Sequence, residues 1–372
     1  MSAIRIAIIG AGQIGKHHLT QYQQVSGIEV AAICDIRGDE AARVAAQFGV
    51  PDTYTDFREV LKRDDIVAVD VCLHNNFHAP VTIEALKAGK HVYCEKPMAG
   101  SYRDAHAMLE VAKETGRMLH IQLGTLFTVE TRAAKTLIDE GKLGKLYHAR
   151  STGYRRRGRP YVDGYGTPSF TRKADASGGA LYDMGVYHIS QLLYLMGMPA
   201  PLRVSGETYQ EMAMLENRRE ISQFDVEELG VGFVKLAGGI TLDIIEAWSV
   251  HMDAFEGSSL MGSEGGIRLP RMKNGHALTY HFTCSDMDMD ATIDLHSAHN
   301  RYHLLNDWAW AYDSPEKHWA AVLQDLVPLM PTAKLALDTM LISEGIYQSS
   351  KLGREMTADE ILELSVSSAV KL

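Results

Sequence analysis

The sequence predicts an α/β fold: a doubly wound parallel sheet followed by an α+β domain with an open, largely antiparallel sheet. An apolar run, residues 4–9, leads into a glycine-rich turn and then a helix, as expected of a strand buried on both faces. Strand-like and helix-like segments alternate to about residue 123, and afterwards β-rich segments follow one another without long helices. Alternation favours a parallel sheet, whereas strands joined by short links favour an antiparallel one.

The turn after the first strand reads Gly10-Ala11-Gly12-Gln13-Ile14-Gly15. In such a turn the first glycine permits the bend, the second lets the backbone approach a pyrophosphate, and the third allows close helix–strand packing. The N-terminus of the following helix attracts the phosphate charge. Because the turn follows a strand and opens a helix, it indicates a Rossmann domain with a dinucleotide at Gly10, Gly12, Gln13, Ile14 and Gly15.

The second predicted strand, residues 29–34, ends at Asp35, which lies 20 residues after Gly15. An acid at this distance hydrogen-bonds the adenosine ribose hydroxyls. Its negative charge also repels a 2′-phosphate, so Asp35 favours NAD over NADP. Arg37, two residues later, leaves some use of NADP open.

The remaining elements follow in order. In the first domain we expect helices at 39–48, 78–88 and 102–115 and strands at 66–73, 92–94 and 118–123. In the second we expect a helix at 128–140, β-rich segments at 145–154, 202–209, 224–236, 239–250, 256–269 and 277–284, a helical region at 315–353 and a helix at 357–363. The acidic stretch 286–294 should form a turn and an edge strand. We therefore predict domains at 1–124 and 125–372, and the C-terminal helices could pack back on the first.

Composition excludes several classes of protein. The 372 residues exceed what one hydrophobic core usually serves, and the net charge of −10 argues against a nucleic-acid partner. The chain has no run of 18 apolar residues and starts directly with a strand, which predicts a cytoplasmic protein without a membrane partner. Four cysteines without a C-x-x-C pair, and 16 histidines without H-E-x-x-H spacing, predict no metal site.

The segment Glu95-Lys96-Pro97 follows a short buried strand. Pro97 biases Lys96 away from helical geometry, and the turn lies at the carboxyl end of a parallel sheet, where such sheets bind ligands. A lysine there can exchange a proton with a hydroxyl whose carbon exchanges hydride with a nicotinamide. The alternative is an ordinary surface lysine before a proline.

A second candidate segment is residues 177–196, where Gly178 and Gly179 precede an apolar helix. On an ideal helix at about 100° per residue, Asp183 and Tyr187 share one face and His188 is rotated away. We favour Tyr187 over His188 as the proton-transfer partner of Lys96, with Asp183 orienting the lysine. The alternative for either residue is a hydrogen-bonded core group.

The loop 154–173 concentrates arginines in an acidic protein. Four of them, at 155, 156, 157 and 159, lie with Tyr154 and other aromatic residues beside the 177–196 segment. Guanidinium groups suit a carboxylate, sulfonate or phosphate, so the loop could bind an anionic sugar. A solvated or oligomer-facing loop is the alternative.

These motifs together resemble the glucose–fructose oxidoreductase / inositol dehydrogenase (Gfo/Idh/MocA) family. The matching stretches are the glycine turn with His18, residues 73–78, residues 85–92 leading into Glu95-Lys96-Pro97, Gly141–Gly144, Ser177–Gly185 and Tyr347–Gly353. The resemblance implies a Rossmann domain, an open second sheet used for oligomers, a nicotinamide cofactor, and sugar or polyol substrates. It places Leu73, His74, Asn75, His78, Glu95 and Lys96 at the cofactor, and Gln122, Arg172 and Lys173 near the substrate. Many similar members have histidine where Tyr187 stands, and some have tyrosine.

We therefore expect an NAD-dependent oxidoreductase that acts on a ring secondary hydroxyl of a sugar, polyol or glycoside. The substrate would contact Lys96, Gln122, Tyr154, Arg155, Arg156, Arg157, Arg172, Lys173, Asp183, Tyr187 and His188. One alternative is an NAD-dependent glycoside hydrolase that oxidises C3 transiently, eliminates the aglycone, adds water and reduces again. Another is a cofactor-binding protein without catalysis. The expected partners are a carbohydrate and further copies of the chain, as a homodimer or homotetramer.

Overall fold

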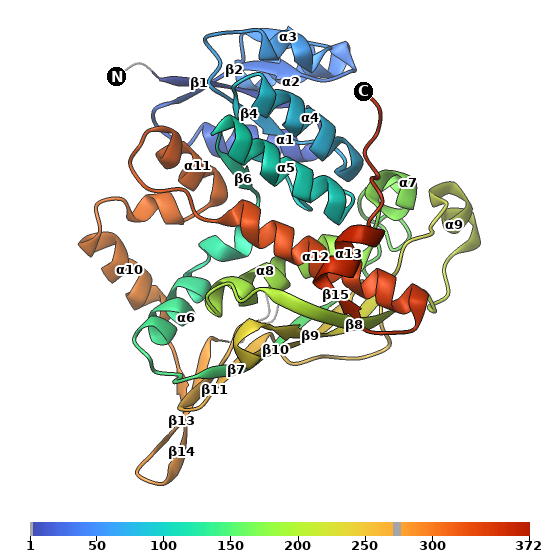
Figure 1. Cartoon of the computed structure of the whole chain (residues 1–372). Coiled ribbons are helices and arrows are strands. Elements are labelled where there is room, and N and C mark those ends of the chain that lie inside the picture. The colour runs from blue at the N-terminus through green and yellow to red at the C-terminus, as the bar shows by residue number, and fades with distance from the viewer. Residues whose placement is uncertain (1–2, 271–276) are drawn as a thin grey trace. The chain divides into compact units, whose positions relative to one another are not determined.

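The computed structural model describes residues 3–270 and 277–372. The chain, coloured in Figure 1 from blue at its N-terminus to red at its C-terminus, forms two compact units. The first consists of residues 1–122, 306–334 and 368–372, and the second of residues 123–305 and 335–367. The first unit is therefore discontinuous, because two later stretches of the chain complete it.

A parallel sheet forms the centre of the first unit and confirms the predicted doubly wound fold. Its order is β3-β2-β1-β4-β5-β6 among the described residues. The strands are β1 (Ile4–Ile9), β2 (Ile28–Cys34), β3 (Asp52–Tyr54), β4 (Ala68–Val71), β5 (His91–Cys94) and β6 (Leu119–Ile121). The strand order reverses between β1 and β4, which is where ligands bind to open α/β sheets.

The helices of the first unit form where the sequence spaces apolar residues by three and four. They are α1 (Gln13–Tyr22), α2 (Gly38–Phe48), α3 (Phe57–Leu61), α4 (Asn75–Lys87), α5 (Tyr102–Thr115), the 3₁₀ turn η5 (Ala309–Tyr312) and α11 (Pro315–Leu323). In α2, Ala41, Val44 and Ala45 form the buried face, and Gly49 ends the helix in a left-handed conformation at φ 71°. The core joins Ile6, Ile8 and Ile33 of the sheet to Leu19 of α1 and Trp319 of α11.

A mixed, mostly antiparallel sheet forms the second unit, as predicted. Its order is β14-β13-β12-β11-β7-β10-β9-β8-β15, and β7 with β10 is its parallel pair within the described ranges. The strands are β7 (Leu146–Tyr154), β8 (Pro201–Tyr209), β9 (Leu229–Leu236), β10 (Thr241–Ala247), β11 (Ser259–Gly262), β12 (Gly265–Arg268), β13 (Thr279–Cys284), β14 (Met287–Thr292) and β15 (Met356–Thr357).

The helical elements of the second unit range from 3₁₀ turns and a π turn to the long helix α12. They are η1 (Gly124–Phe127), α6 (Val129–Asp139), η2 (Pro168–Thr171), α7 (Lys173–Ala176), the π turn η3 (Leu181–Gly185), α8 (Val186–Leu195), α9 (Glu216–Ser222), η4 (Ala237–Gly239), α10 (Leu295–Leu305), most of α12 (Thr332–Leu352) and α13 (Ala358–Leu364). Helix α8 packs on β7 with Ile189, Leu192 and Leu193 buried. In the part of the chain that the structure describes, no helix is both long and apolar enough to cross a membrane.

The structure corrects one local prediction, refines a second and confirms a third. The helical region expected at 315–353 is two helices, because α11 ends near Gln324 and Pro328 and Pro331 lie in the link to α12. The segment 256–269 is a hairpin of β11 and β12. The acidic stretch 286–294 does form a turn and an edge strand, β14, with Ser285 and Asp286 at positive φ in the turn.

Candidate active site

The glycine turn of the first unit leaves no room for side chains at two of its three glycines. A Cβ on Gly10, which has φ +107°, would lie 2.3 Å from the Cys72 carbonyl oxygen at the end of β4. A Cβ on Gly15 would lie 2.0 Å from the Gly10 carbonyl oxygen. At Gly12, by contrast, no described atom lies within 4 Å of that position. The open space over Gly12, at the N-terminus of α1, fits the approach of a pyrophosphate.

Asp35 is tied to this turn. Its Oδ2 accepts a hydrogen bond from the Ala11 N–H at 2.9 Å, and its Oδ1 accepts one from the Arg37 N–H at 2.9 Å. The side chain of Arg37 is 63% exposed, and its Nε lies 3.5 Å from Asp35 Oδ1. Gln13 and Ile14 are exposed in the first turn of α1. The structure thus fixes a carboxylate beside the glycine turn, with ribose-accepting capacity left on its oxygens.

The ends of β4 and β5 are joined through His78. Its Nδ1 lies 2.8 Å from the Pro97 carbonyl oxygen and its Nε2 lies 3.0 Å from that of Leu73. Burial lowers the pKa of His78 despite these backbone contacts. His78 is fully buried, whereas His74 is exposed and Asn75 is half-buried. His78 therefore ties the turn at residue 73 to the Glu95-Lys96-Pro97 turn.

Lys96 itself is half-buried directly after Glu95. Glu95 Oε2 accepts a hydrogen bond from the Lys96 N–H at 2.9 Å. Gln122, also half-buried, donates its backbone N–H to the Cys94 carbonyl oxygen at 2.9 Å. The predicted cofactor residues thus gather at the carboxyl ends of β1, β2, β4 and β5.

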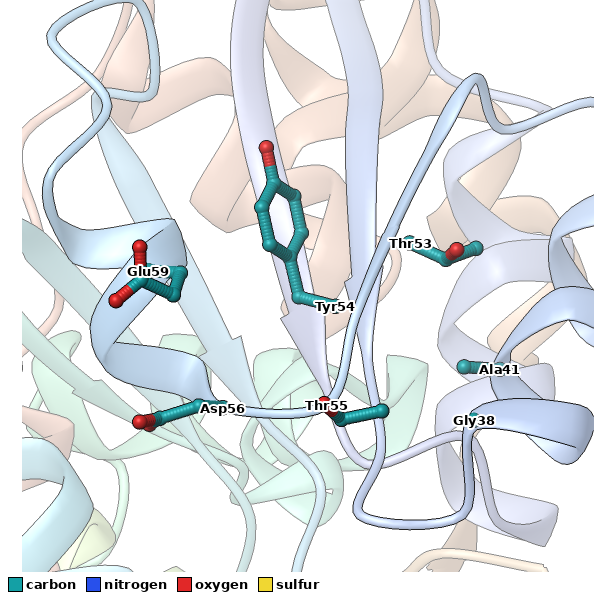
Figure 2. Close-up of a pocket in the computed structure, with 7 residues that line it drawn as sticks. All are labelled: Gly38, Ala41, Thr53, Tyr54, Thr55, Asp56 and Glu59. Atoms are coloured by element: carbon teal, nitrogen blue, oxygen red, sulfur yellow. The ribbon is translucent and has the colours of Figure 1, made fainter.

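A separate pocket lies between α2, β3 and the start of α3 (Figure 2). It measures about 260 Å³ and is lined by Gly38, Ala41, Thr53, Tyr54, Thr55, Asp56 and Glu59. This is smaller than most small-molecule sites. Asp56 is committed to capping α3, where it accepts from the Arg58 N–H at 3.0 Å. None of the residues predicted for the site lines this pocket.

In the second unit, a buried carboxylate holds the start of the 177–196 segment. Glu227 accepts hydrogen bonds from Gly179 N–H at 2.8 Å, from Leu181 N–H at 3.0 Å and from the Tyr347 hydroxyl at 2.8 Å. Burial raises the pKa of Glu227 above its ordinary value, against these hydrogen bonds. Sequence reasoning missed Glu227, because nothing local marks one acid in a predicted strand. Through this hydrogen bond Tyr347, in the C-terminal motif, anchors Glu227.

The helix after this entry does not begin as an α-helix. Residues Leu181–Gly185 form a π turn, and α8 starts at Val186. The angle of 100° per residue, from which we placed Asp183 and Tyr187 on one face, therefore does not apply across this segment. Tyr187 is half-buried, and its carbonyl oxygen accepts from the Thr125 hydroxyl at 2.8 Å.

His188 faces a buried carboxylate. Its Nδ1 lies 3.1 and 3.0 Å from the two carboxylate oxygens of Glu246, which is fully buried on β10. The Ser151 hydroxyl of β7 donates to Glu246 Oε1 at 2.8 Å. Burial alone would lower the pKa of His188, but the Glu246 charge outweighs it and raises that pKa. With Nδ1 committed to Glu246, Nε2 is the nitrogen left for proton exchange.

The pair of His188 and Glu246 leaves no room for a side chain at Gly153. Gly153 of β7 pairs with Glu246 of β10 across the sheet. A Cβ on Gly153 would lie 1.8 Å from Glu246 Oε2 and 2.8 Å from His188 Nδ1. The sequence analysis did not identify Glu246. Leu242, Ile244 and Glu246 occupy alternate positions of β10, and all three are buried on the same face of the strand. An acid at such a position was the signal available.

Asp183 lies in a second polar group. Trp248 donates its Nε1–H to Asp183 Oδ2 at 2.9 Å, and Arg155 Nη1 lies 3.5 Å from the same oxygen. Arg155 is close enough to His188 to oppose the rise of its pKa. The structure thus brings Asp183 and Arg155 together, with His188 within electrostatic reach of Arg155.

The other cations of the arginine loop have different surroundings. Arg159 is a scaffold residue, 1% exposed, whose guanidinium donates to Asp163 at 3.0 and 3.1 Å and to Glu228 at 2.9 Å. Arg156, Arg157 and Lys173 are exposed, and Arg172 pairs with Asp175 at 2.5 Å. Tyr154 is half-buried and donates its hydroxyl to the Met252 carbonyl oxygen. Arg155 is therefore the loop arginine that the structure joins to another predicted site residue.

Comparison with known proteins places this geometry in a family. Residues 4–123 match the model of the oxidoreductase family with an NAD-binding Rossmann fold, and residues 131–268 match the Gfo/Idh/MocA C-terminal domain. D-glucoside 3-dehydrogenase of Escherichia coli K12 is 30% identical over 276 residues, which is 72% of this chain and 77% of that protein. Myo-inositol 2-dehydrogenase of Thermotoga maritima is 30% identical over 194 residues, 52% of this chain and 55% of that protein.

Solved structures agree on the fold. Levoglucosan dehydrogenase in complex with NADH and L-sorbose superposes with a TM-score of 0.80 at 20% identity, covering 96% of this chain and 99% of that one. Its complex with NADH and levoglucosan gives a TM-score of 0.79 at 21% identity, covering 96% of this chain and 100% of that one. The first unit is an NAD-binding Rossmann domain, and the chain belongs to the Gfo/Idh/MocA family of NAD-dependent oxidoreductases.

Proposed function

We propose that the protein oxidises a secondary hydroxyl on the ring of a sugar, polyol or glycoside. The observation that carries this is the pair of His188 with buried Glu246, close to Asp183 and Arg155. A histidine held on a carboxylate by one nitrogen is suited to remove a hydroxyl proton with the other. Three relatives support the proposal by name: D-glucoside 3-dehydrogenase, myo-inositol 2-dehydrogenase and levoglucosan dehydrogenase are dehydrogenases named for such molecules.

The chain's residues divide the work as follows. NAD, when bound on Gly10, Gly12, Gly15 and Asp35, supplies the hydride acceptor. Lys96 and His188 take up the hydroxyl proton, and Asp183 orients the substrate hydroxyl. Loss of the proton from the hydroxyl oxygen and of a hydride from the carbon that bears it would convert the secondary alcohol to a ketone, so the reaction balances as alcohol plus NAD⁺ giving ketone, NADH and a proton.

The π turn favours His188, rather than Tyr187, as the proton-transfer residue of the second unit. Many similar family members have Asp-x-Gly-x-His, in which the histidine is the fourth residue after the acid. Here His188 is the fifth residue after Asp183, and a π turn closes with one residue more than an α turn. The extra residue is thus absorbed at Leu181–Gly185, and we assign His188 the position that histidine takes in those members.

The test is a panel of D-glucosides, inositols, anhydrosugars and sugar acids, assayed in parallel for NADH formation and for aglycone release. NADH formation without release supports the proposal. Aglycone release without accumulated NADH would instead show the hydrolase reaction through transient C3 oxidation, in which Tyr187 and His188 divide the two proton transfers. Binding of NAD with neither outcome on any substrate contradicts both.

Asp35 should set the choice of cofactor. We expect Asp35→Ser to weaken NAD binding and to improve relative use of NADP, because it removes the negative charge beside the ribose while keeping a hydroxyl that can accept from the Ala11 N–H. Titration of both cofactors by NADH and NADPH fluorescence measures this. Asp39→Ser, at an acid in the first turn of α2, is the control. Tighter NADP than NAD binding by the wild type would overturn the assignment.

Arg155 should select for an anionic substrate. We expect Arg155→Ala to lower kcat/KM on a glucuronide by at least about tenfold, and less on the matching glucoside. Tenfold is about 1.4 kcal/mol, below the roughly 2–5 kcal/mol for a fully desolvated charge pair, because the Arg155 side chain is 36% exposed. Arg155→Lys should not restore it fully, because the guanidinium fork is lost. Arg150→Ala is the control, because Arg150 lies on β7, shortly before the loop, and pairs with Asp243. The same comparison at Arg156 and Arg157 completes the test, and equal use of both sugars by all variants contradicts it.

A further inference from the structure

A closed group of titratable side chains lies in the first unit behind the Glu95-Lys96 turn. At its centre is His18 of α1, fully buried between Asp70 of β4 and Glu95. Tyr22, Cys72 and Glu316 complete the group, and all of these side chains are buried. The proposed chemistry of the site uses none of these side chains.

The contacts of His18 define its protonation state. Its Nδ1 lies 2.8 Å from Asp70 Oδ2, and its Nε2 lies 3.0 Å from Glu95 Oε1. A neutral imidazole carries one N–H, so it would point a lone pair at one of these carboxylate oxygens. An imidazolium donates to both. The geometry therefore requires either a charged His18 or a protonated carboxyl group.

The surrounding charges favour the imidazolium. Three carboxylates, those of Asp70, Glu95 and Glu316, surround this single ring, with Glu316 Oε1 at 3.8 Å from Nε2. Buried carboxylates without a positive partner are costly. Burial by itself would lower the pKa of His18, but the charge and hydrogen bond of Asp70, with the contact of Cys72, together hold that pKa well above its ordinary value. Burial would likewise raise the pKa of Glu95, but the hydrogen bond and charge of His18 hold it lower.

Two further contacts fix the ring in place. The Tyr22 hydroxyl donates to Asp70 Oδ2 at 3.0 Å, so Asp70 cannot turn away from His18 without losing it. The Tyr93 ring stacks on the His18 ring, with centroids 5.2 Å apart and planes at 9°, and its hydroxyl donates to Glu316 Oε1 at 3.2 Å. His18 is thus held from α1, β4, β5 and α11.

Glu95 connects His18 to Lys96 through its two carboxylate oxygens. One of its oxygens faces His18 and the other accepts the Lys96 N–H at 2.9 Å. We propose that His18, as an imidazolium, is a positioning residue of the reaction: it holds Glu95 ionised and oriented, and Glu95 in turn fixes the backbone and the charge of Lys96. This rests on the proposed role of Lys96 in proton transfer.

The proposal predicts effects of opposite sign from two substitutions. His18→Gln removes the positive charge that shares Glu95 with Lys96. The Glu95 carboxylate then stabilises the Lys96 ammonium more strongly, and the ascending limb of the kcat/KM–pH profile moves to higher pH. Glu95→Gln removes the negative charge and moves the same limb downward. Each displacement should be on the order of half to one pH unit. The groups that face His18 and could contribute are Tyr22 and His17 on α1, Asp70 and Cys72 at β4, Tyr93, Glu95 and Lys96 at β5, and Glu316 on α11.

The control is His120→Gln. His120 is a second fully buried histidine of the same unit, but its Nδ1 lies 2.9 Å from the Thr332 hydroxyl rather than against a carboxylate. This variant should melt at a lower temperature without moving the limb. If His18→Gln and Glu95→Gln move the limb in the same direction, or not at all, the positioning role is overturned.

A second measurement needs no substrate, and its first part, the state of the His18 ring, needs no variant. Nitrogen-15 NMR of the histidine rings in the full wild-type chain should show His18 with both ring nitrogens protonated at pH 8, and the Lys96 amide proton should shift between wild type and Glu95→Gln. One unprotonated ring nitrogen, or a titration near pH 6.5, would overturn the proposal. If no alcohol in the panel is oxidised while the ring is doubly protonated, the proposed function fails and the state of His18 stands.

Discussion

Lys96→Ala should lower turnover by at least about a hundredfold while NAD still binds, the scale expected for loss of a positioned acid or base. The expected result follows from the position of Lys96 after β5, where Glu95 holds its backbone N–H and His78 holds Pro97. These contacts are made by the main chain and by other side chains, so truncation at Cβ leaves the turn intact. Stopped-time NADH assays give kcat, and NADH fluorescence titration gives the affinity for the cofactor.

Lys87→Ala is the matched control for this variant, because Lys87 is an exposed lysine at the end of α4. It should behave as the wild type in both assays. A Lys96→Ala protein that keeps more than about a tenth of the turnover would remove Lys96 from proton transfer, and one that no longer binds NAD would make it a cofactor residue.

His188→Asn should lower turnover by a similar factor, at least about a hundredfold, and more than Tyr187→Phe. Asparagine keeps a group that can donate to Glu246 but cannot exchange a proton near neutral pH. Glu246→Gln should lower turnover less, since the imidazole stays but loses the charge that raises its pKa. Comparison of kcat across the three variants ranks the residues, and a larger loss from Tyr187→Phe would return the proton-transfer role to the phenol.

The same pair gives a result that does not depend on substrate. Glu246 raises the pKa of His188 above its unfolded value of about 6.5. The pair therefore stabilises the fold fully below that pH and loses this contribution as the pH rises through the raised pKa. The difference in free energy of unfolding between wild type and Glu246→Gln should shrink from pH 6 to pH 9, as measured by urea denaturation. A constant difference would mean that the two groups are not coupled.

The parts of the site that the sequence could predict are those that local rules determine. The glycine turn, Asp35 and the Glu95-Lys96-Pro97 turn each depend on a strand end and a few adjacent residues, and their spacing along the chain is enough to identify them. The alternation of strands and helices likewise predicts both sheets. Long-range pairing determines the rest. Glu246 and Gly153 meet His188 because β10 lies beside β7, and no spacing in the sequence announces that register.

One argument fails for a specific physical reason. The helical-face argument for Tyr187 assumed 3.6 residues per turn, whereas the π turn at Leu181–Gly185 changes the rotation between Asp183 and every later residue. In the arginine loop, charge alone does not distinguish a buried guanidinium from an exposed one. Arg159 is enclosed by Asp163 and Glu228, while Arg156 and Arg157 are exposed.

The discontinuity of the first unit has a consequence for how the protein is made. Its core includes Trp319, whose ring stacks on His120 with centroids 5.8 Å apart, and its buried network includes Glu316. Both lie in the stretch 306–334, which a ribosome produces only after residues 123–305. At roughly 5–20 residues per second, that delay is on the order of ten to forty seconds. During translation Tyr93 and His120 are therefore made well before the Trp319 ring that packs on both of them, so this part of the Rossmann core is completed only late in synthesis.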